Sequence, residues 1–233
     1  MGVDAADINN DSHLDLMVLD MTSEDNFRLK SNMSGMNPDS FWKVVNDGGH
    51  YQYMFNTLQL NNGNETFSDI AQFTQTAATD WSWASLVADF DNDGNKDIYI
   101  TNGLLRDIRN TDADKKISDL VSKTFNKYII ENPDNSNVSI WDVIDLQELL
   151  DFLPSQKLKN YFYKNYGDLK FKNEIDQLGL GDPSFSHGAS YADLDNDGDL
   201  DLIVSNVNEK VFIYRNNSDK NFVRLKLEDD SPT

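Results

Sequence analysis

The chain has 233 residues, of which 39% are apolar and 11% aromatic, so it can bury a hydrophobic core and is not a disordered acidic tail. Its 40 acidic residues outnumber the 20 basic ones, and the net charge of -20 would repel nucleic-acid phosphates and anionic membrane surfaces. The sequence has no cysteine for disulfides or thiolate metal sites, and no run of about 18 apolar residues for direct membrane insertion.

The first β segment is the run MGVDAADINNDSHLDLMVLD, from Met1 to Asp20. It matches the second half of a longer repeat that occurs in full further along the chain, so we interpret it as a shortened copy. The following residues, 22–51, predict little beyond a turn at Gly48 and Gly49.

The repeat itself is seen when residues 56–102 are laid over residues 160–206, without a gap and at an offset of 104 residues. The segment NTLQLNNGNETF matches NYFYKNYGDLKF, and WSWASLVADFDNDGNKDIYITN matches FSHGASYADLDNDGDLDLIVSN. Alternating apolar residues and an Asn-Gly turn predict about four short strands in each copy. A further copy begins at VFIYRNNSDKNF, residues 211–222.

Residues 107–159 interrupt this β pattern and predict a helical insertion. Apolar residues from Ile117 to Ile129 recur at helical spacing, and the resulting stripe would pack against the β body or fill a groove of a partner. A second helix is expected to begin at Ser139, capped by that side chain together with Asp142, and to end before Pro154.

Three acidic loops hold 12 of the 40 acidic residues. The second and third loops read D-x-D-x-D-G-x-x-D, and the first is a degraded form of the same pattern. Side-chain oxygens at positions 1, 3 and 5, a glycine turn at 6, a backbone carbonyl at 7 and a carboxylate at 9 can wrap a hard cation such as Ca²⁺. The predicted ligands are Asp7, Asn9, Asp11, His13 and Asp15, then Asp89, Asp91, Asp93, Asn95 and Asp97, then Asp193, Asp195, Asp197, Asp199 and Asp201.

An EF-hand is the alternative reading of these loops, because its calcium loop begins with the same spacing. It needs a glutamate at position 12 and a helix on each side. Position 12 is Ile100 in the second loop and Val204 in the third, and both residues lie in β-like runs. We therefore predict Ca²⁺ as the cofactor, held in short loops between paired strands.

The loops and their flanking strands resemble the calcium loops of FG-GAP or VCBS repeats, which are the blades of integrin-type β-propellers. The variants WSWASLVADFDNDGNKDIYITN and SHGASYADLDNDGDLDLIVSNV are most similar to the propeller proteins associated with an ASPIC/UnbV tail, a family that includes cartilage acidic protein and bacterial members from Bacteroidetes. The resemblance implies a mainly β fold, a partial β-propeller of four-stranded blades with a helical insertion.

The same resemblance implies export and a binding or scaffolding role, with no catalytic residues. We expect a non-enzymatic, calcium-binding propeller that is extracellular or on the outer cell surface and binds a protein or glycan. The alternative is an accessory propeller of a secreted polysaccharide-degrading enzyme whose active site lies outside this segment. The histidines favour the first reading, since His13 occupies a backbone-ligand position and His187 aligns with Trp83 in the sister copy.

These patterns divide the chain into three expected segments. Residues 1–106 are expected to form propeller blades with the first two calcium loops, residues 107–159 the helical insertion, and residues 160–233 a blade with the third loop and the start of the next. Propellers close with about four to eight blades, so we expect this chain to be a piece of a larger protein.

Overall fold

The computed structural model describes residues 1–32, 38–134, 138–223 and 225. The chain divides into two compact units, a β unit and a helical unit. The β unit comprises Met1–Met21, Phe55–Gly103 and Leu158–Thr233, and the helical unit comprises Thr22–Met54 and Leu104–Lys157. Each unit is thus built from segments that are far apart in the sequence.

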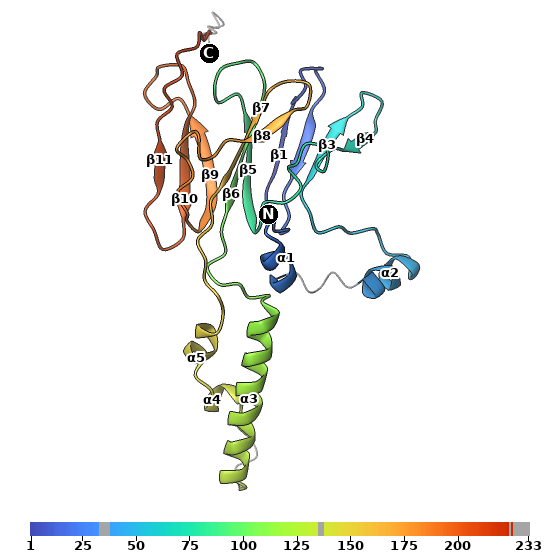
Figure 1. The fold of residues 1–233 in the computed structure, drawn as a ribbon, viewed down its shortest axis with the longest axis vertical. Coiled ribbons are helices and arrows are strands. Elements are labelled where there is room, and N and C mark those ends of the chain that lie inside the picture. The colour runs from blue at the N-terminus through green and yellow to red at the C-terminus, as the bar shows by residue number, and fades with distance from the viewer. Residues whose placement is uncertain (33–37, 135–137, 224, 226–233) are drawn as a thin grey trace, which may run out of the picture. The chain divides into compact units, whose positions relative to one another are not determined.

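Three antiparallel sheets make up the β unit (Figure 1). The predicted mainly β fold is confirmed. The first sheet contains β1 (Val3–Ala6), β2 (Asp15–Val18), β3 (Thr57–Asn61) and β4 (Phe67–Asp69); the second contains β5 (Ser82–Ala88), β6 (Asp97–Asn102), β7 (Tyr161–Asn165) and β8 (Phe171–Asn173); and the third contains β9 (Ser186–Ala192), β10 (Asp201–Asn206) and β11 (Phe212–Tyr214).

The sheets are offset from the sequence repeat by half a copy. The copy at residues 56–102 supplies β3 and β4 to the first sheet, and β5 and β6 to the second. Each sheet therefore begins with a pair of strands joined by an acidic loop and takes its later strands from the following copy. The connections from β2 to β3 and from β6 to β7 contain the two segments of the helical unit.

Apolar side chains fill the spaces between neighbouring sheets. One buried cluster includes Met17 and Leu58 of the first sheet with Ile98 and Ile100 of the second. A second cluster includes Tyr99 and Phe162 of the second sheet together with Val204 and other residues of the third. Because both faces of β6 are covered, all six of its residues are buried, which explains the three consecutive apolar residues from Ile98 to Ile100 at its centre.

The first strands of the sheets lie next to one another, since β1 contacts β5 and β5 contacts β9. The ring of Trp83 on β5 packs against the ring of His187 on β9, with centroids 4.6 Å apart and the ring planes tilted by 34°. The Trp83 indole N–H also donates a hydrogen bond of 2.6 Å to the carbonyl oxygen of Gly103. Trp83 thus fills space between sheets, and its sister residue His187 has a packing partner.

The helical unit contains all five helices of the described residues: α1 (Asn26–Asn32), α2 (Pro38–Asn46), α3 (Thr111–Glu131), α4 (Ile140–Val143) and α5 (Leu146–Asp151). Asn110 caps α3 by accepting the backbone N–H of Ala113, and Asp112 and Asp114 lie in its first turn, where the helix dipole favours acids. The apolar stripe of α3 is half-buried, and α3 contacts α1 and α4. None of the helices in the described ranges is long and apolar enough to cross a membrane.

The second predicted helix is correct at its start and wrong in its length. Ser139 and Asp142 form the expected capping box of α4. The helix then breaks at Ile144, whose backbone is extended, and Asp145 caps a separate helix by accepting the backbone N–H of Gln147. The aspartate side chain competes for the backbone N–H groups and starts a new helix instead of continuing the old one.

A buried ion pair joins the two segments of the helical unit. The guanidinium nitrogens of Arg28 on α1 lie 3.0 and 3.2 Å from the two carboxylate oxygens of Asp107. Asn110 adds a hydrogen bond of 3.1 Å to Asn32. The sequence did not predict α1 or this pairing, because both depend on contacts between residues about 80 positions apart.

Candidate metal centre

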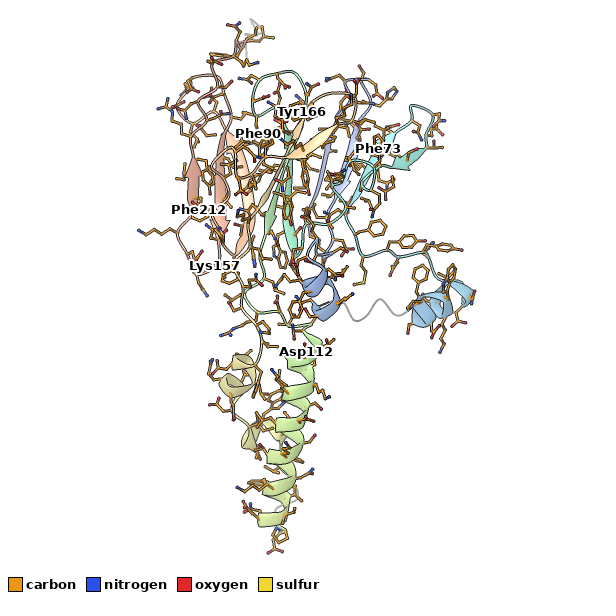
Figure 2. All side chains as sticks on the ribbon, in the orientation of Figure 1. Phe73, Phe90, Asp112, Lys157, Tyr166 and Phe212 are labelled. Carbon is orange, nitrogen blue, oxygen red and sulfur yellow. The ribbon has the colours of Figure 1, made fainter. Side chains whose placement is uncertain are left out.

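The three acidic loops each join the first two strands of a sheet (Figure 1). Loop 1 is residues 7–15, loop 2 is residues 89–97 and loop 3 is residues 193–201. The flanking strands exclude the EF-hand, which needs helices there. Phe90, labelled in Figure 2, directly follows the first aspartate of loop 2 and belongs to the apolar cluster between the second and third sheets, which anchors the loop.

The aspartate at position 1 holds the turn of each loop. The carboxylate of Asp7 accepts the backbone N–H groups of Asp11 and Ser12 at 3.0 and 2.7 Å. Asp89 accepts those of Asp93 and Gly94 at 3.0 and 2.9 Å, and Asp193 accepts that of Gly198 at 3.2 Å. The repeated pattern shows that these carboxylates order the loop backbone and point toward its interior.

The structure brings positions 1, 3 and 5 together in two of the loops. Oxygens of Asp89, Asp91 and Asp93 all lie within 4.8 Å of one another, and so do those of Asp193, Asp195 and Asp197. Loop 1 has only two carboxylates at these positions, since position 3 is Asn9. The side-chain amide of Asn9 donates a hydrogen bond of 2.9 Å to the carboxylate of Asp11. Loops 2 and 3 are therefore the candidate metal sites.

The dimensions and chemistry of loop 2 fit a calcium ion. Oxygens on opposite sides of Ca²⁺ lie about 5 Å apart, so oxygens within 4.8 Å of one another can share one ion. The Oδ1 atom of Asp91 is buried and has no hydrogen-bond partner, although such atoms are usually satisfied. Carboxylate oxygens are the ligands that hard cations prefer, so Asp89, Asp91 and Asp93 would hold the ion, with no need for nitrogen or sulfur donors.

The aspartate at position 9 has a structural role in all three loops, because it accepts hydrogen bonds from backbone N–H groups. One oxygen of Asp97 accepts the backbone N–H of Phe90 at 3.3 Å, and the other accepts that of Asn165 at 2.9 Å. Asp15 and Asp201 make the same two contacts in their own loops. These aspartates lie outside the two groups of three carboxylates, and their predicted role as ligands stays a prediction.

Burial makes the charge of these carboxylates costly. Burial, together with the nearby charges of Asp91 and Asp93, raises the pKa of Asp97 to about 7, although the hydrogen bond from the backbone N–H of Asn165 lowers it. Burial also raises the pKa of Asp15, although the hydrogen bonds from the backbone N–H groups of Asn61 and Ile8 lower it. A cation in loop 2 would offset the repulsion that raises the pKa of Asp97.

The side chains at position 7 turn back toward position 5. The imidazole Nδ1 of His13 lies 3.1 Å from Asp11, and the amide of Asn95 donates to Asp93 at 3.0 Å. Asp199 is buried and accepts the backbone N–H of Ser218 at 2.7 Å. The backbone carbonyls of these residues remain the predicted ligands at position 7.

Ser12 occupies position 6 of loop 1 in the strained conformation expected from the pattern. Its φ is 71°, whereas Gly94 and Gly198 have φ values of 91° and 95° at the same position. This left-handed backbone costs a residue other than glycine roughly 1 kcal/mol. Loop 1 is thus poorer both in carboxylates and in backbone preference.

In every sheet an asparagine follows the apolar run of the third strand, and sequence reasoning did not identify it as important. Asn165 donates its amide to the carbonyl oxygens of Lys96 in loop 2 and Ile8 in loop 1, at 3.0 and 2.9 Å. Asn216 does the same with Leu200 and Phe90, in loops 3 and 2, at 3.2 and 2.6 Å. Asn61, Asn165 and Asn216 align in the internal repeat, so the repeated asparagine could have been recognised from the sequence.

A second missed asparagine links one loop to the next. At position 4, Asn10 donates to the carbonyl oxygen of Gly94 at 3.1 Å, and Asn92 donates to that of Gly198 at 3.3 Å. Both residues have positive φ, at 60° and 54°, which asparagine tolerates better than most residues. The three loops are thus joined in a row by side-chain hydrogen bonds.

A comparison with known protein families also finds a repeat in this chain. The model of a family described as FG-GAP-like repeat matches residues 39–100 and 148–204, which together make up just over half of the chain. No curated protein matches the chain.

Proposed function

The chain belongs to the FG-GAP-like repeat family, and from this membership we propose that it is a calcium-binding β-propeller repeat protein. The observation that carries the proposal is the repeated gathering of three aspartates in loops 2 and 3, with a buried, unpartnered oxygen on Asp91. The three sheets are the propeller blades in this proposal, and the adjacent first strands β1, β5 and β9 support it. The loop sequences further suggest the ASPIC/UnbV-associated group and a bacterial source.

We also propose that the protein works outside the cell or on its outer surface. Calcium sites of extracellular modules have dissociation constants of about 10⁻⁴ to 10⁻³ M, so they fill at extracellular calcium levels and stay empty in the cytosol. An ion bound to each group of aspartates would hold its loop rigid. The hydrogen bonds of Asn10 and Asn92, which join each loop to the next, would extend this rigidity to the neighbouring loops. A loop surface ordered in this way suits binding.

The proposed partner is a protein or a glycan, bound without catalysis. The net charge of -20 speaks against nucleic acid as a partner. A screen against immobilised glycans and surface proteins, run beside a screen for polysaccharide cleavage, separates a binding role from the accessory domain of a degrading enzyme. Binding without cleavage supports the proposal, and cleavage by the isolated protein overturns its non-enzymatic part.

We predict that the calcium sites rank by their carboxylate count. Calorimetric titration should find two sites with dissociation constants of about 10⁻⁴ M. Asp91→Ala should abolish one and Asp195→Ala the other, because each removes a carboxylate from a group of three. Asp7→Ala should leave both in place, since loop 1 has the poorer ligand set.

Asp182→Ala is the matched control for these variants, because Asp182 is exposed, lies outside the loops and carries the same charge. It should keep both sites. Loss of the tightest site in Asp7→Ala would contradict the ranking, and a wild-type protein that takes up no calcium would contradict the proposed function.

A further inference from the structure

Basic side chains enter loops 2 and 3 from the end of the third strand of their own sheets, or from the residue that follows it. The ammonium group of Lys164, on β7, contacts the Oδ2 atom of Asp91. The guanidinium group of Arg215, directly after β11, lies 2.8 Å from Asp195 Oδ2 and 3.3 Å from Asp197 Oδ2. Each therefore binds carboxylates of the groups that the proposed function assigns to calcium.

The two basic residues occupy the same position in their sheets. Lys164 directly precedes Asn165 and Arg215 directly precedes Asn216, and both asparagines donate their backbone N–H to the position 9 aspartate. In the first sheet the residue at this position is Leu60, which packs against the apolar core. The loops with three gathered carboxylates thus have a basic neighbour, and the loop with two has an apolar one.

Three carboxylates within 4.8 Å repel one another strongly when no cation is near. A basic side chain that reaches into such a group relieves part of this repulsion. It also uses a carboxylate oxygen that a calcium ion would need, and its positive charge would repel the ion. The same contact therefore stabilises the calcium-free loop and weakens calcium binding.

We propose that Lys164 and Arg215 are built-in counter-cations that hold loops 2 and 3 in shape at low calcium and are displaced from their aspartates when calcium binds. This inference rests on the proposed calcium-binding function and concerns its regulation. The two residues set how much calcium is needed to fill each loop.

The effect is larger at loop 2 than at loop 3. The side chain of Lys164 is 24% exposed and that of Asp91 34%, whereas the side chain of Arg215 is 65% exposed. Water screens an exposed pair more than a partly buried one. Removal of the lysine charge should therefore change calcium binding more than removal of the arginine charge.

The test is calorimetric titration of Lys164→Met with calcium chloride, in an Asp195→Ala background that removes the loop 3 site. Methionine keeps the length and apolar stem of the side chain without the charge. We expect the calcium affinity of loop 2 to rise roughly three- to tenfold. In chelator, the same variant should melt about 2–4 °C below its background.

Two controls isolate the role of the charge. Lys164→Arg keeps the charge and should keep the affinity of its background within about twofold. Lys170→Met makes the same change in net charge at an exposed lysine that pairs with Asp168, and it should leave the affinity unchanged. Arg215→Met, measured in an Asp91→Ala background, gives an independent reading at loop 3, with an expected gain of about twofold.

The outcomes separate this proposal from the proposed function. Unchanged calcium affinity in both Lys164→Met and Arg215→Met, beside normal binding by the wild type, would overturn the counter-cation role and leave the calcium function standing. An affinity gain equalled by Lys170→Met would also overturn it, since net charge alone would then explain the change. Absence of calcium binding in the wild type and all variants would overturn both.

Discussion

Replacing Asn165 with alanine is expected to lower the free energy of unfolding of the β unit by about 2–4 kcal/mol. Asn165 is fully buried, and its amide donates hydrogen bonds to the carbonyl oxygens of Ile8 in loop 1 and Lys96 in loop 2. Its side-chain oxygen also accepts the backbone N–H of Gly167 at 2.9 Å. Alanine would leave the buried carbonyl of Ile8 and the partly buried groups of Lys96 and Gly167 without this partner. An unsatisfied buried group costs about 1–3 kcal/mol, and the partly buried groups cost less because water reaches them.

The measurement is urea unfolding followed by tryptophan fluorescence at saturating calcium. Substituting phenylalanine for the exposed Trp42 and Trp141 of the helical unit leaves Trp81 and Trp83 to report on the β unit.

Asn61→Ala is the matched control for Asn165→Ala. Its amide nitrogen donates one hydrogen bond of 3.2 Å, to Leu14, and its oxygen accepts the backbone N–H of Gly63 at 3.0 Å. Both hydrogen bonds are exposed to water, so the expected loss is below about 1 kcal/mol. Equal losses in the two variants would contradict the account of Asn165 as a clamp between two loops.

Replacing Arg28 with methionine is expected to destabilise the helical unit by about 3–5 kcal/mol. Arg28 and Asp107 form a two-pronged ion pair with side chains only 9% and 4% exposed. Methionine preserves most of the packing volume and leaves the Asp107 carboxylate buried without its counter-charge. The two segments of the helical unit, which the pair joins, should then separate more easily.

Because all helices of the described residues lie in the helical unit, the helical band of the circular dichroism spectrum follows its unfolding. Lys127→Met is the matched control, since Lys127 pairs with Glu131 at the surface, and such pairs contribute about 0.3–0.5 kcal/mol. The double variant Arg28→Met/Asp107→Leu should recover much of the lost stability, because it removes both charges of the pair and leaves neither one buried alone. A double variant as unstable as Arg28→Met alone would show that the ion pair is not the cause.

The local spacing of the sequence was enough to predict which carboxylates gather in the candidate metal sites. Alternate residues of a short loop between paired strands face its interior, so D-x-D-x-D-G places Asp89, Asp91 and Asp93 together. The same reasoning predicted the capping box at Ser139, because it depends only on residues a few positions apart.

The remaining contacts could not be predicted from spacing, because they join residues that meet only after the sheets pack. Asn165 reaches the carbonyl of Ile8 across 157 residues, and Lys164 reaches Asp91 across 73. The half-copy offset between repeat and sheet also has a tertiary origin, since β7 pairs with β6 across the helical segment. The internal repeat marked these positions as equivalent without saying which loop each contacts.

The most direct test of calcium binding is the melting temperature of the β unit with and without chelator. Two sites with dissociation constants of about 10⁻⁴ M, at calcium of about 1 mM, would each stabilise the folded state by roughly 1.4 kcal/mol. Chelation should therefore lower the melting temperature by about 5–10 °C. The double variant Asp91→Ala/Asp195→Ala should melt at one temperature in both conditions. A wild-type protein that also melts at the same temperature with and without chelator would contradict the calcium account.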